Sequence, residues 1–214
     1  MLTTEPGSVS RPALGGTCLD SSLRSFGTLF PMEMKAGRQR PRPPEASTVV
    51  AYDAAWPDFF RAMRERLRAL FVGSEAVIEH VGSTAVPGLA AKPIVDIDVV
   101  VPFSADIPDA VRRLESGGYI HRGNLGIPGR EAFDVPSELP YHHLYVVAAD
   151  TKPHLDHVLL RDHLRTHPDD AERYGRRKLD VAHLITAESR QAYMEAKASI
   201  VEELLAVARR EFAS

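Results

Sequence analysis

Two aspartates separated by a single residue have the spacing of a metal-binding carboxylate pair. Asp96 and Asp98 lie in the segment 95–101, where acidic and apolar residues alternate before Val100. A period of two predicts a β-strand, so both carboxylates point to the same face of a sheet. Such a pair suits Mg²⁺ or Mn²⁺, which prefer oxygen ligands and often share them with substrate phosphates. We predict Asp96 and Asp98 as metal ligands and catalytic residues; the alternative is an ordinary solvated strand face, which Val100 on the same face disfavours.

A second chemical motif lies just upstream of this pair. Gly82, Ser83 and Thr84 follow a predicted strand, 77–81, and precede a short predicted helix. Glycine lets the backbone approach a phosphate, and N–H groups, hydroxyls and a helix N-terminus can then bind its oxygens. Ser83 and Thr84 would otherwise simply cap a helix. Together the two motifs predict one half of a site for metal-assisted chemistry on a nucleoside triphosphate.

The elements that must position these motifs follow from apolar periodicity and from proline and glycine punctuation. Strands are predicted at 48–52, 77–81, 93–101, 119–121, 130–135 and 141–149, and helices at 57–71, 107–116, 155–167, 169–184 and 189–212, the last capped by Ser189. The order is mixed α and β first and helical afterwards. Residues 1–47, with paired glycines and an Arg-Pro-rich run, are predicted to be a disordered or linker tail before a domain at 48–214.

The two motifs also carry a family resemblance. A Gly-Ser pair, a short connection and Asp-x-Asp on a strand resemble the polymerase-β-type nucleotidyltransferase superfamily, and the string HVGSTAVPGLAAKPIVDIDV resembles the GrpB family within it. The likeness runs from about Thr48 to Glu211 and includes YHHL at 141–144 and LLRDHLR at 159–165. It implies an α+β fold: a nucleotidyltransferase-like mixed β-sheet with flanking helices and a helical C-terminal layer. GrpB-type domains are also similar to an extension of some dephospho-coenzyme A kinases.

The chain departs from the superfamily at the third carboxylate, which usually stands on a later strand. The matching segment here is Tyr-His-His-Leu-Tyr at 141–145, without an aspartate. Neighbouring strand residues face opposite ways, and Leu144 is expected in the core, so His143 is the predicted site residue and third metal ligand. Histidine suits Mn²⁺ or Zn²⁺ better than Mg²⁺. One metal ion, a different metal, or binding without catalysis all remain open.

Basic residues are the candidates for triphosphate contact, although any one of them taken alone is more often a solvated charge. The candidates are Lys92, Arg130, Arg161, Lys178 and Lys197. The resemblance implies that the helices carrying Lys178 and Lys197 close over the nucleotide. His80 is either a structural histidine or a site residue. The later histidines, His154, His157, His163 and His167, are interpreted as polar residues on scattered faces of a helix rather than as a metal cluster.

Composition excludes several classes of protein. The net charge of −3 gives no basic footprint, so duplex nucleic acid is not an expected partner. Cys18 is the single cysteine, which excludes an intrachain disulfide and a multi-cysteine zinc site. No apolar run has the length of a transmembrane helix, and no signal peptide is recognisable, so a cytoplasmic protein without a membrane partner is expected.

The leading hypothesis is a metal-dependent nucleotidyltransferase. It would use Mg²⁺ or Mn²⁺ to transfer a nucleotidyl group from a nucleoside triphosphate to an unknown small-molecule acceptor. The alternative is a nucleotide- or coenzyme A-related metabolite-binding module without turnover, which the missing third carboxylate motivates. A third hypothesis is a metal-dependent hydrolase that uses the histidine-rich pocket.

Overall fold

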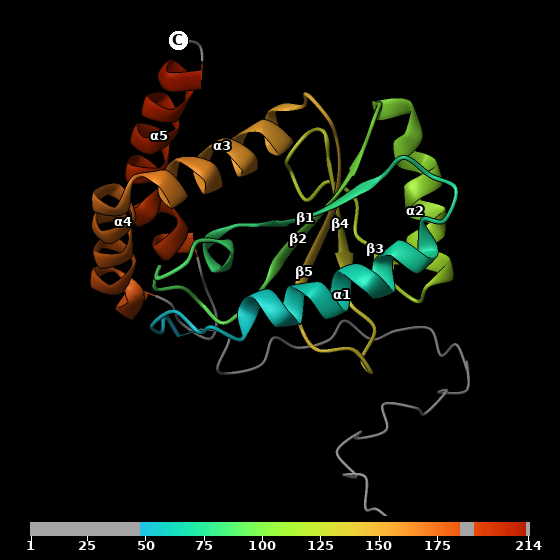
Figure 1. Ribbon diagram of the computed structural model, residues 1–214, viewed down its shortest axis with the longest axis horizontal. Coiled ribbons are helices and arrows are strands. Elements are labelled where there is room, and N and C mark those ends of the chain that lie inside the picture. Colours follow the sequence, from blue (N-terminus) through green and yellow to red (C-terminus); the bar gives the residue numbers. More distant parts are fainter. Residues whose placement is uncertain (1–47, 185–190, 213–214) are drawn as a thin grey trace, which may run out of the picture. The chain divides into compact units, whose positions relative to one another are not determined.

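A five-stranded mixed sheet lies at the centre of the described chain (Figure 1). The structure is a computed structural model that describes residues 48–184 and 191–212. Its strands are β1 (Val77–Val81), β2 (Asp96–Val101), β3 (Ile120–His121), β4 (Arg130–Asp134) and β5 (His143–Ala148). They lie in the order β1-β2-β5-β4-β3, with β2 and β5 parallel and the other neighbouring pairs antiparallel. The Asp-x-Asp strand, β2, is therefore an inner strand between β1 and β5.

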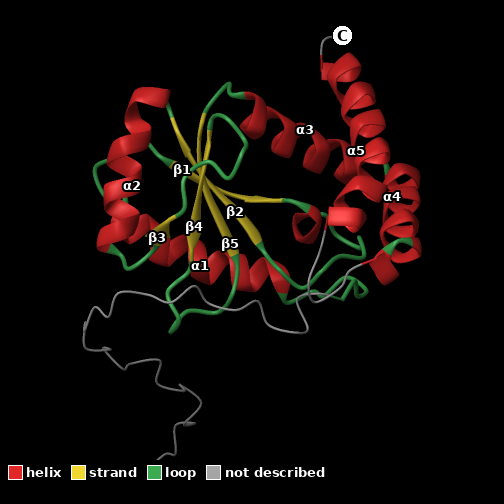
Figure 2. Ribbon diagram, turned by 180° about the vertical axis from the view of Figure 1, so that it is seen from behind, coloured by secondary structure: helices red, strands yellow, loops and turns green. Residues whose placement is uncertain are grey.

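Helices surround this sheet. They are α1 (Trp56–Leu70), α2 (Ile107–Ser116), α3 (Lys152–Thr166), α4 (Pro168–Asp180) and α5 (Gln191–Phe212), with 3₁₀ turns η2 (Ser83–Ala85), η3 (Ser104–Asp106) and η4 (Ala182–Leu184). Figures 1 and 2 show α4 and α5 side by side, at the far end of the sheet from α2. Among the described residues, no helix combines the length and the apolar character needed to cross a membrane.

One face of the sheet forms the main hydrophobic core. Ile97 and Val99 of β2 are fully buried and lie beside Leu144 and Val146 of β5. The same cluster contains residues from the apolar faces of α1 and α2, namely Met63, Leu67, Ala110 and Leu114. Successive strand residues point to opposite faces, so Asp96 and Asp98, on either side of Ile97, lie on the other face of the sheet.

On the other face, α3 packs against β1 and β5, and α3 in turn packs against α4 and α5. From α3, Arg161 places Nη1 2.7 Å from Glu79 Oε2 on β1, which ties the helix to the sheet. A second apolar cluster joins the segment after η2 to all three C-terminal helices, through Val86, Leu89, Leu164, Tyr174, Ile200 and Leu204. The helical layer is thus held both to the sheet and to the segment that follows the Gly-Ser motif.

The predicted fold class is confirmed: the chain is α+β with a mixed sheet and a helical C-terminal part. The predicted strand at 48–52 is wrong. Only Val50 pairs, with Ala91, through backbone bonds of 2.8 and 2.9 Å. The bridge is isolated, with no neighbouring pairs that would extend it into a strand. The tail at 1–47 and the cap Ser189 lie outside the described residues.

Candidate functional site

The two aspartates lie on the covered face of β2 and differ in burial. Asp96 is half-buried, whereas Asp98 is fully buried, at 0% exposure. Asp98 Oδ1 has no hydrogen-bond partner among the described residues. A buried carboxylate oxygen without a partner is costly, because it has lost its water and gained nothing in return. A cation beside this oxygen would remove that cost, so the donor set fits the divalent ion predicted from sequence.

Two histidines hold the remaining sides of these carboxylates. His143 lies directly opposite Asp96 in the parallel β2–β5 pair, and its Nδ1 is 2.7 Å from Asp96 Oδ1. From α3, His157 places Nδ1 2.7 Å from Asp98 Oδ2. Each histidine thus bonds one oxygen of its carboxylate and does not bond the second oxygen. His143 lies on the polar face, as predicted, and its Nδ1 bond orients the Asp96 carboxylate. Its role as a third metal ligand stays a prediction.

The pKa values of this group reflect its close packing. Burial acts to raise the pKa of Asp96, but the hydrogen bond from His143 and the charges of His143, His157 and Lys197 outweigh it and hold that pKa below its usual value. Burial acts to lower the pKa of His157, but its hydrogen bond to Asp98 and the negative charge there raise it instead. The site therefore favours the ionised form of Asp96 and the protonated form of His157.

An aromatic ring and a guanidinium border the histidines. Tyr145, two residues after His143 on β5, has ring-to-ring distances of 6.2 Å to both His143 and His157. The guanidinium carbon of Arg130, from β4, lies 4.3 Å from the centre of the Tyr145 ring. Its charge lowers the pKa of His157. The predicted residue Arg130 is therefore part of the same cluster, held in place by a cation–π contact.

The Gly-Ser segment lies against the first aspartate. Gly82 has φ 72° and ψ −170°, a backbone conformation that is almost restricted to glycine. A Cβ atom at this position would lie 2.4 Å from Asp96 Oδ2. Glycine is therefore required both for the turn and for the close approach. Ser83 follows Gly82 at the start of η2 and is half-buried.

Thr84 is directed elsewhere. It is buried at 1% exposure, and its Oγ1 lies 3.0 Å from His80 Nε2 and 3.4 Å from the carbonyl oxygen of Ile94. The His80 ring stacks on Phe60 of α1, on the core side of the sheet, and burial lowers its pKa to about 4. The hydroxyl predicted to bind phosphate thus forms a structural contact instead, and His80 is a structural histidine.

The predicted lysines gather around two tyrosines of the C-terminal helices. Lys92 and Lys197 place Nζ 4.1 and 5.6 Å from the centre of the Tyr193 ring. Lys178 places Nζ 4.4 Å from the Tyr174 ring. The charge of Lys197 lowers the pKa of both Lys178 and Asp96, so Lys197 lies within electrostatic reach of both groups. Of the three lysines, Lys197 is thus the one linked electrostatically to both Asp96 and Lys178.

Lys178 is the most unusual of these cations. It is 1% exposed, and its Nζ has no hydrogen-bond partner among the described residues. Burial, and after it the charge of Lys197, lower its pKa to about 7. A buried ammonium without a partner fits an anionic ligand, because the ligand would supply the missing charge.

Two residues of α3 were assigned wrongly from sequence. Arg161, a predicted triphosphate contact, is held by Glu79, by Asp162 and by the carbonyl oxygen of His80. It therefore joins α3 to β1. His157 was assigned to general helix polarity. Its spacing from Arg161 and Leu164 places all three on one helix face, and this pattern could have identified it.

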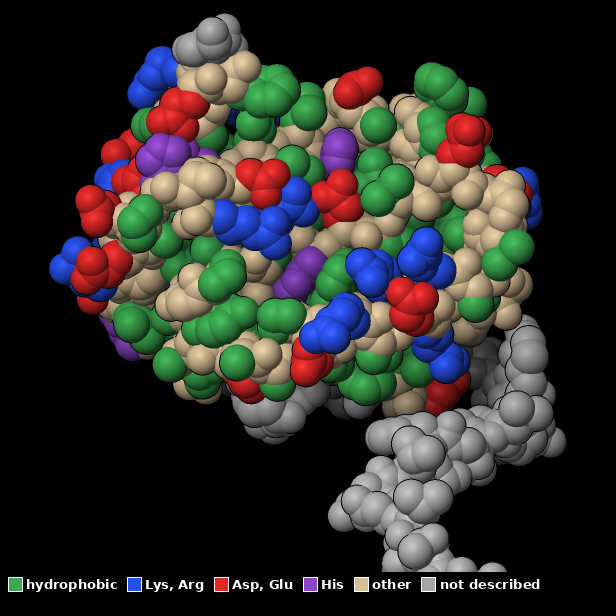
Figure 3. Space-filling view, in the orientation of Figure 1, with side chains coloured by type: hydrophobic (Ala, Val, Ile, Leu, Met, Phe, Trp, Pro, Cys, Tyr) green, Lys and Arg blue, Asp and Glu red, His purple; other side chains and the backbone are tan. Residues whose placement is uncertain are grey.

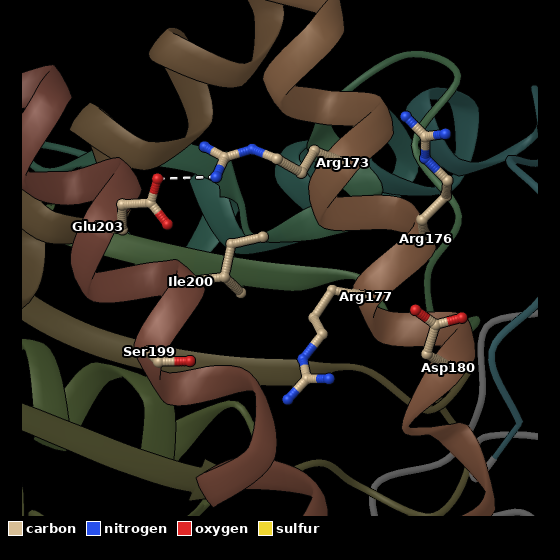
Figure 4. A pocket seen from close by; sticks show the side chains of 7 residues that line it. All are labelled: Arg173, Arg176, Arg177, Asp180, Ser199, Ile200 and Glu203. Carbon is tan, nitrogen blue, oxygen red and sulfur yellow. Dashed lines mark hydrogen bonds and ion pairs between the residues drawn. The ribbon is translucent and has the colours of Figure 1, made fainter.

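A groove of about 410 Å³ lies between α4 and α5, and its lining does not include the aspartates. Figure 4 shows Arg173 and Arg177 of α4 directed toward Glu203 and Ser199 of α5, whereas Arg176 points away from α5. Arg173 pairs with Glu203 at 2.7 Å, and Arg177 donates to the carbonyl oxygen of Ala196. Arg173 and Arg177, which line this groove, thus already have partners within the protein. Acidic and basic side chains are also interspersed over the face seen in Figure 3.

Comparison with known families places the chain in a class. The family model described as "GrpB protein" matches residues 46–207, so the chain belongs to the GrpB family. It is 31% identical over 134 residues to the UPF0157 protein YqkA of Bacillus subtilis, which covers 63% of this chain and 39% of YqkA. It is 37% identical over 163 residues to the UPF0157 protein PA4798 of Pseudomonas aeruginosa, covering 73% of this chain and 65% of that protein. The chain thus spans less than two thirds of both relatives.

A solved structure matches over most of the domain. The crystal structure of the conserved protein GrpB from Enterococcus faecalis aligns with a TM-score of 0.67 and 28% identity, covering 78% of this chain and 99% of that one. The fold described above is therefore the GrpB fold.

Proposed function

We propose that the chain binds a nucleoside triphosphate together with Mg²⁺ or Mn²⁺ and transfers a nucleotidyl group to a small acceptor. One observation carries the proposal: a buried carboxylate oxygen on Asp98 and a buried ammonium on Lys178 both lack partners among the described residues. A metal–triphosphate complex supplies a cation for the first and an anion for the second. The nucleotidyltransferase resemblance of the Gly-Ser and Asp-x-Asp motifs supports the same assignment.

Each residue has a stated role in this proposal. Asp96 and Asp98 would hold the ion, and His143 and His157 keep the two carboxylates oriented through their 2.7 Å bonds. Gly82 and Ser83 would bind phosphate oxygens through backbone N–H groups and a hydroxyl. The phosphate-binding cations would be Lys92, Arg130, Lys178 and Lys197. The ion, when bound, neutralises charge on the phosphates.

The reaction is an in-line displacement at the α-phosphorus. An acceptor oxygen forms the new P–O bond, the bond from the α-phosphorus to the bridging oxygen breaks, and pyrophosphate leaves. If the acceptor is a hydroxyl, its proton passes to water. The protein contributes positioning and charge stabilisation rather than a covalent intermediate.

A second candidate function is nucleotide binding without turnover. The observation that favours it is His143, which stands on β5 directly opposite Asp96, where the resemblance places a third carboxylate. With two carboxylates the site would hold one ion, and a second ion that activates the acceptor would lack its ligand. A coenzyme A-related metabolite would satisfy the same cations.

The experiment that tests both candidates combines melting curves with product analysis. Each nucleoside triphosphate is added with and without MnCl₂, and pyrophosphate release is followed with a panel of acceptors. Release supports transfer, whereas metal-dependent stabilisation without release supports binding alone. If no nucleotide or coenzyme A derivative gives pyrophosphate release or stabilisation, both candidate functions are refuted.

Matched variants link the result to the site. Asp98→Asn should abolish the metal-dependent part of nucleotide stabilisation, because it removes a carboxylate oxygen from the ion. Asp134→Asn is the control, since Asp134 lies on β4 and pairs with Arg122 at 2.9 Å. Equal loss in both variants would contradict the assignment of the ion to the Asp pair.

A further inference from the structure

A second group of metal-type donors lies where α3 ends and the last turn of α5 passes. His163 and His167 are one helical turn apart at the end of α3, and Glu211 comes from α5. One ligand atom from each residue can be chosen so that all lie within 4.8 Å of one another. Among the residues described, this is the one such group of three or more; Asp96, Asp98 and His143 do not form one. Figure 3 shows histidine and acidic side chains together near this end of α5.

The prediction that these histidines lie on scattered helix faces is wrong for His163 and His167. Residues four apart share a face, and the rings of His163 and His167 stack at 4.0 Å between centres with an interplanar angle of 17°. Glu211 then closes the group, with Oε2 3.0 Å from His163 Nδ1 and Oε1 3.4 Å from His167 Nε2.

The outer hydrogen bonds fix which nitrogen of each ring is left for a ligand. Nδ1 of His167 lies 3.0 Å from both the carbonyl oxygen of His163 and the hydroxyl of Thr166, and the carbonyl, which only accepts, favours a hydrogen on Nδ1. Nε2 of the buried His163, whose side chain is 1% exposed, lies 2.8 Å from Asp170 Oδ2. Donation from that Nε2 lowers the pKa of Asp170. Nδ1 of His163 and Nε2 of His167 therefore both remain directed at Glu211.

Two nitrogen lone pairs directed at one carboxylate repel it unless positive charge stands between them. One divalent ion satisfies both nitrogens and the carboxylate together. A ligating histidine whose other nitrogen donates to a carboxylate or backbone carbonyl is also the usual arrangement around a protein-bound metal.

We propose that His163 Nδ1, His167 Nε2 and the Glu211 carboxylate bind a zinc-type divalent ion. Imidazole nitrogens select Zn²⁺ or a similar transition metal over Mg²⁺. Asp170 and the His163 carbonyl are the outer partners that orient the rings. The ion fastens the last turn of α5 to the end of α3, and α5 also carries Tyr193 and Lys197 beside the candidate nucleotide site. It is a structural ion, distinct from the one proposed at Asp96 and Asp98.

Metal content of the full chain, prepared without a histidine tag, tests this site. Equilibrium dialysis against ZnCl₂ or MgCl₂, followed by elemental analysis, is carried out on the wild type and on Asp98→Asn. Asp98→Asn should retain one tightly bound zinc ion, and magnesium should not replace it. Zinc should also raise the melting temperature, by roughly 5–10 °C at a hundredfold excess over Kd.

Variants assign the ion to these residues. Glu211→Gln and His167→Gln each remove a direct ligand, so each should weaken zinc binding by more than the roughly tenfold to hundredfold that loss of an outer partner costs. Each should therefore remove most of the zinc-dependent rise in melting temperature. His183→Gln is the matched control, because His183 is an exposed histidine whose Nδ1 bonds the carbonyl oxygen of Asp180, three residues earlier. It should bind zinc like the wild type.

Co²⁺ adds a readout that does not depend on stability. Bound at this site it should give visible d–d absorption that His167→Gln abolishes, and circular dichroism establishes that each variant is folded. The proposal is overturned if the wild type binds no zinc, if the His183→Gln control loses as much as His167→Gln, or if Asp98→Asn alone removes the ion.

Discussion

Replacing the buried lysine of α4 with methionine should make the protein more stable. Lys178 is 1% exposed and its Nζ lacks a hydrogen-bond partner among the described residues. Burial and the Lys197 charge lower its pKa from 10.5 to about 7. At ~1.4 kcal/mol per pKa unit, this lysine costs the folded state about 4 kcal/mol at neutral pH. Lys178→Met removes the charge and keeps the apolar stem, so we expect a gain of roughly 2–4 kcal/mol in the free energy of unfolding.

The pH dependence gives the prediction its sign. Between pH 7 and 10.5 the unfolded chain binds a proton on Lys178 that the folded chain has released. Wild-type stability should therefore rise with pH through this window relative to the variant. The advantage of Lys178→Met is largest at or below pH 7 and shrinks towards pH 10. Urea unfolding followed by circular dichroism at pH 7, 8.5 and 10 measures the difference directly.

A matched exposed lysine provides the control. Lys152→Met changes a side chain that is 78% exposed and pairs with Asp156, so its stability should change by about 0.5 kcal/mol or less. The same Lys178→Met protein should lose nucleotide-dependent stabilisation. A variant less stable than the wild type at pH 7, or a difference that stays constant to pH 10, would refute the argument that Lys178 is an uncompensated charge.

Three further predictions concern the segment around the Gly-Ser motif. Gly82→Ala should destabilise the fold by about 2–4 kcal/mol in urea unfolding, because Gly82 has a φ of 72° and an added Cβ would lie 2.4 Å from Asp96 Oδ2. Adding Asp96→Ala removes the steric clash but not the backbone strain, so it should recover only part of the lost stability. Full recovery would argue against backbone strain. Because the folded pKa of His80 is lowered to about 4, stability should fall as pH drops from 6.5 towards 4, and His80→Gln should flatten that curve. Arg161→Met should lower the free energy of unfolding by about 1–3 kcal/mol. A double-mutant cycle with Glu79→Gln should show coupling, since Arg161 Nη1 and Glu79 Oε2 are 2.7 Å apart. Simple additivity of the two losses would mean that this ion pair contributes nothing to stability.

Sequence alone determined the local parts of the site. The alternation around Asp96 and Asp98 identified β2 and its polar face, because side-chain direction in a strand follows from its period of two. The same rule assigned His143 to the polar face and Leu144 to the core, and the parallel pairing of β2 with β5 agrees. Gly82 was recognised as a residue that lets the backbone approach a ligand, and the structure adds the carboxylate that it contacts.

Tertiary structure decided everything that depends on how distant segments meet. His157 reaches Asp98 across 59 residues of sequence, and His163 reaches Glu211 across 48, because α3 is packed between the sheet and α5. No periodicity within one helix encodes the identity of a partner on another element. The same holds for Thr84 and Arg161, whose residue types suggested phosphate contact until packing gave them structural partners. Burial of Lys178 likewise depends on the joint packing of the C-terminal helices, so its lowered pKa is a property of the fold rather than of the residue.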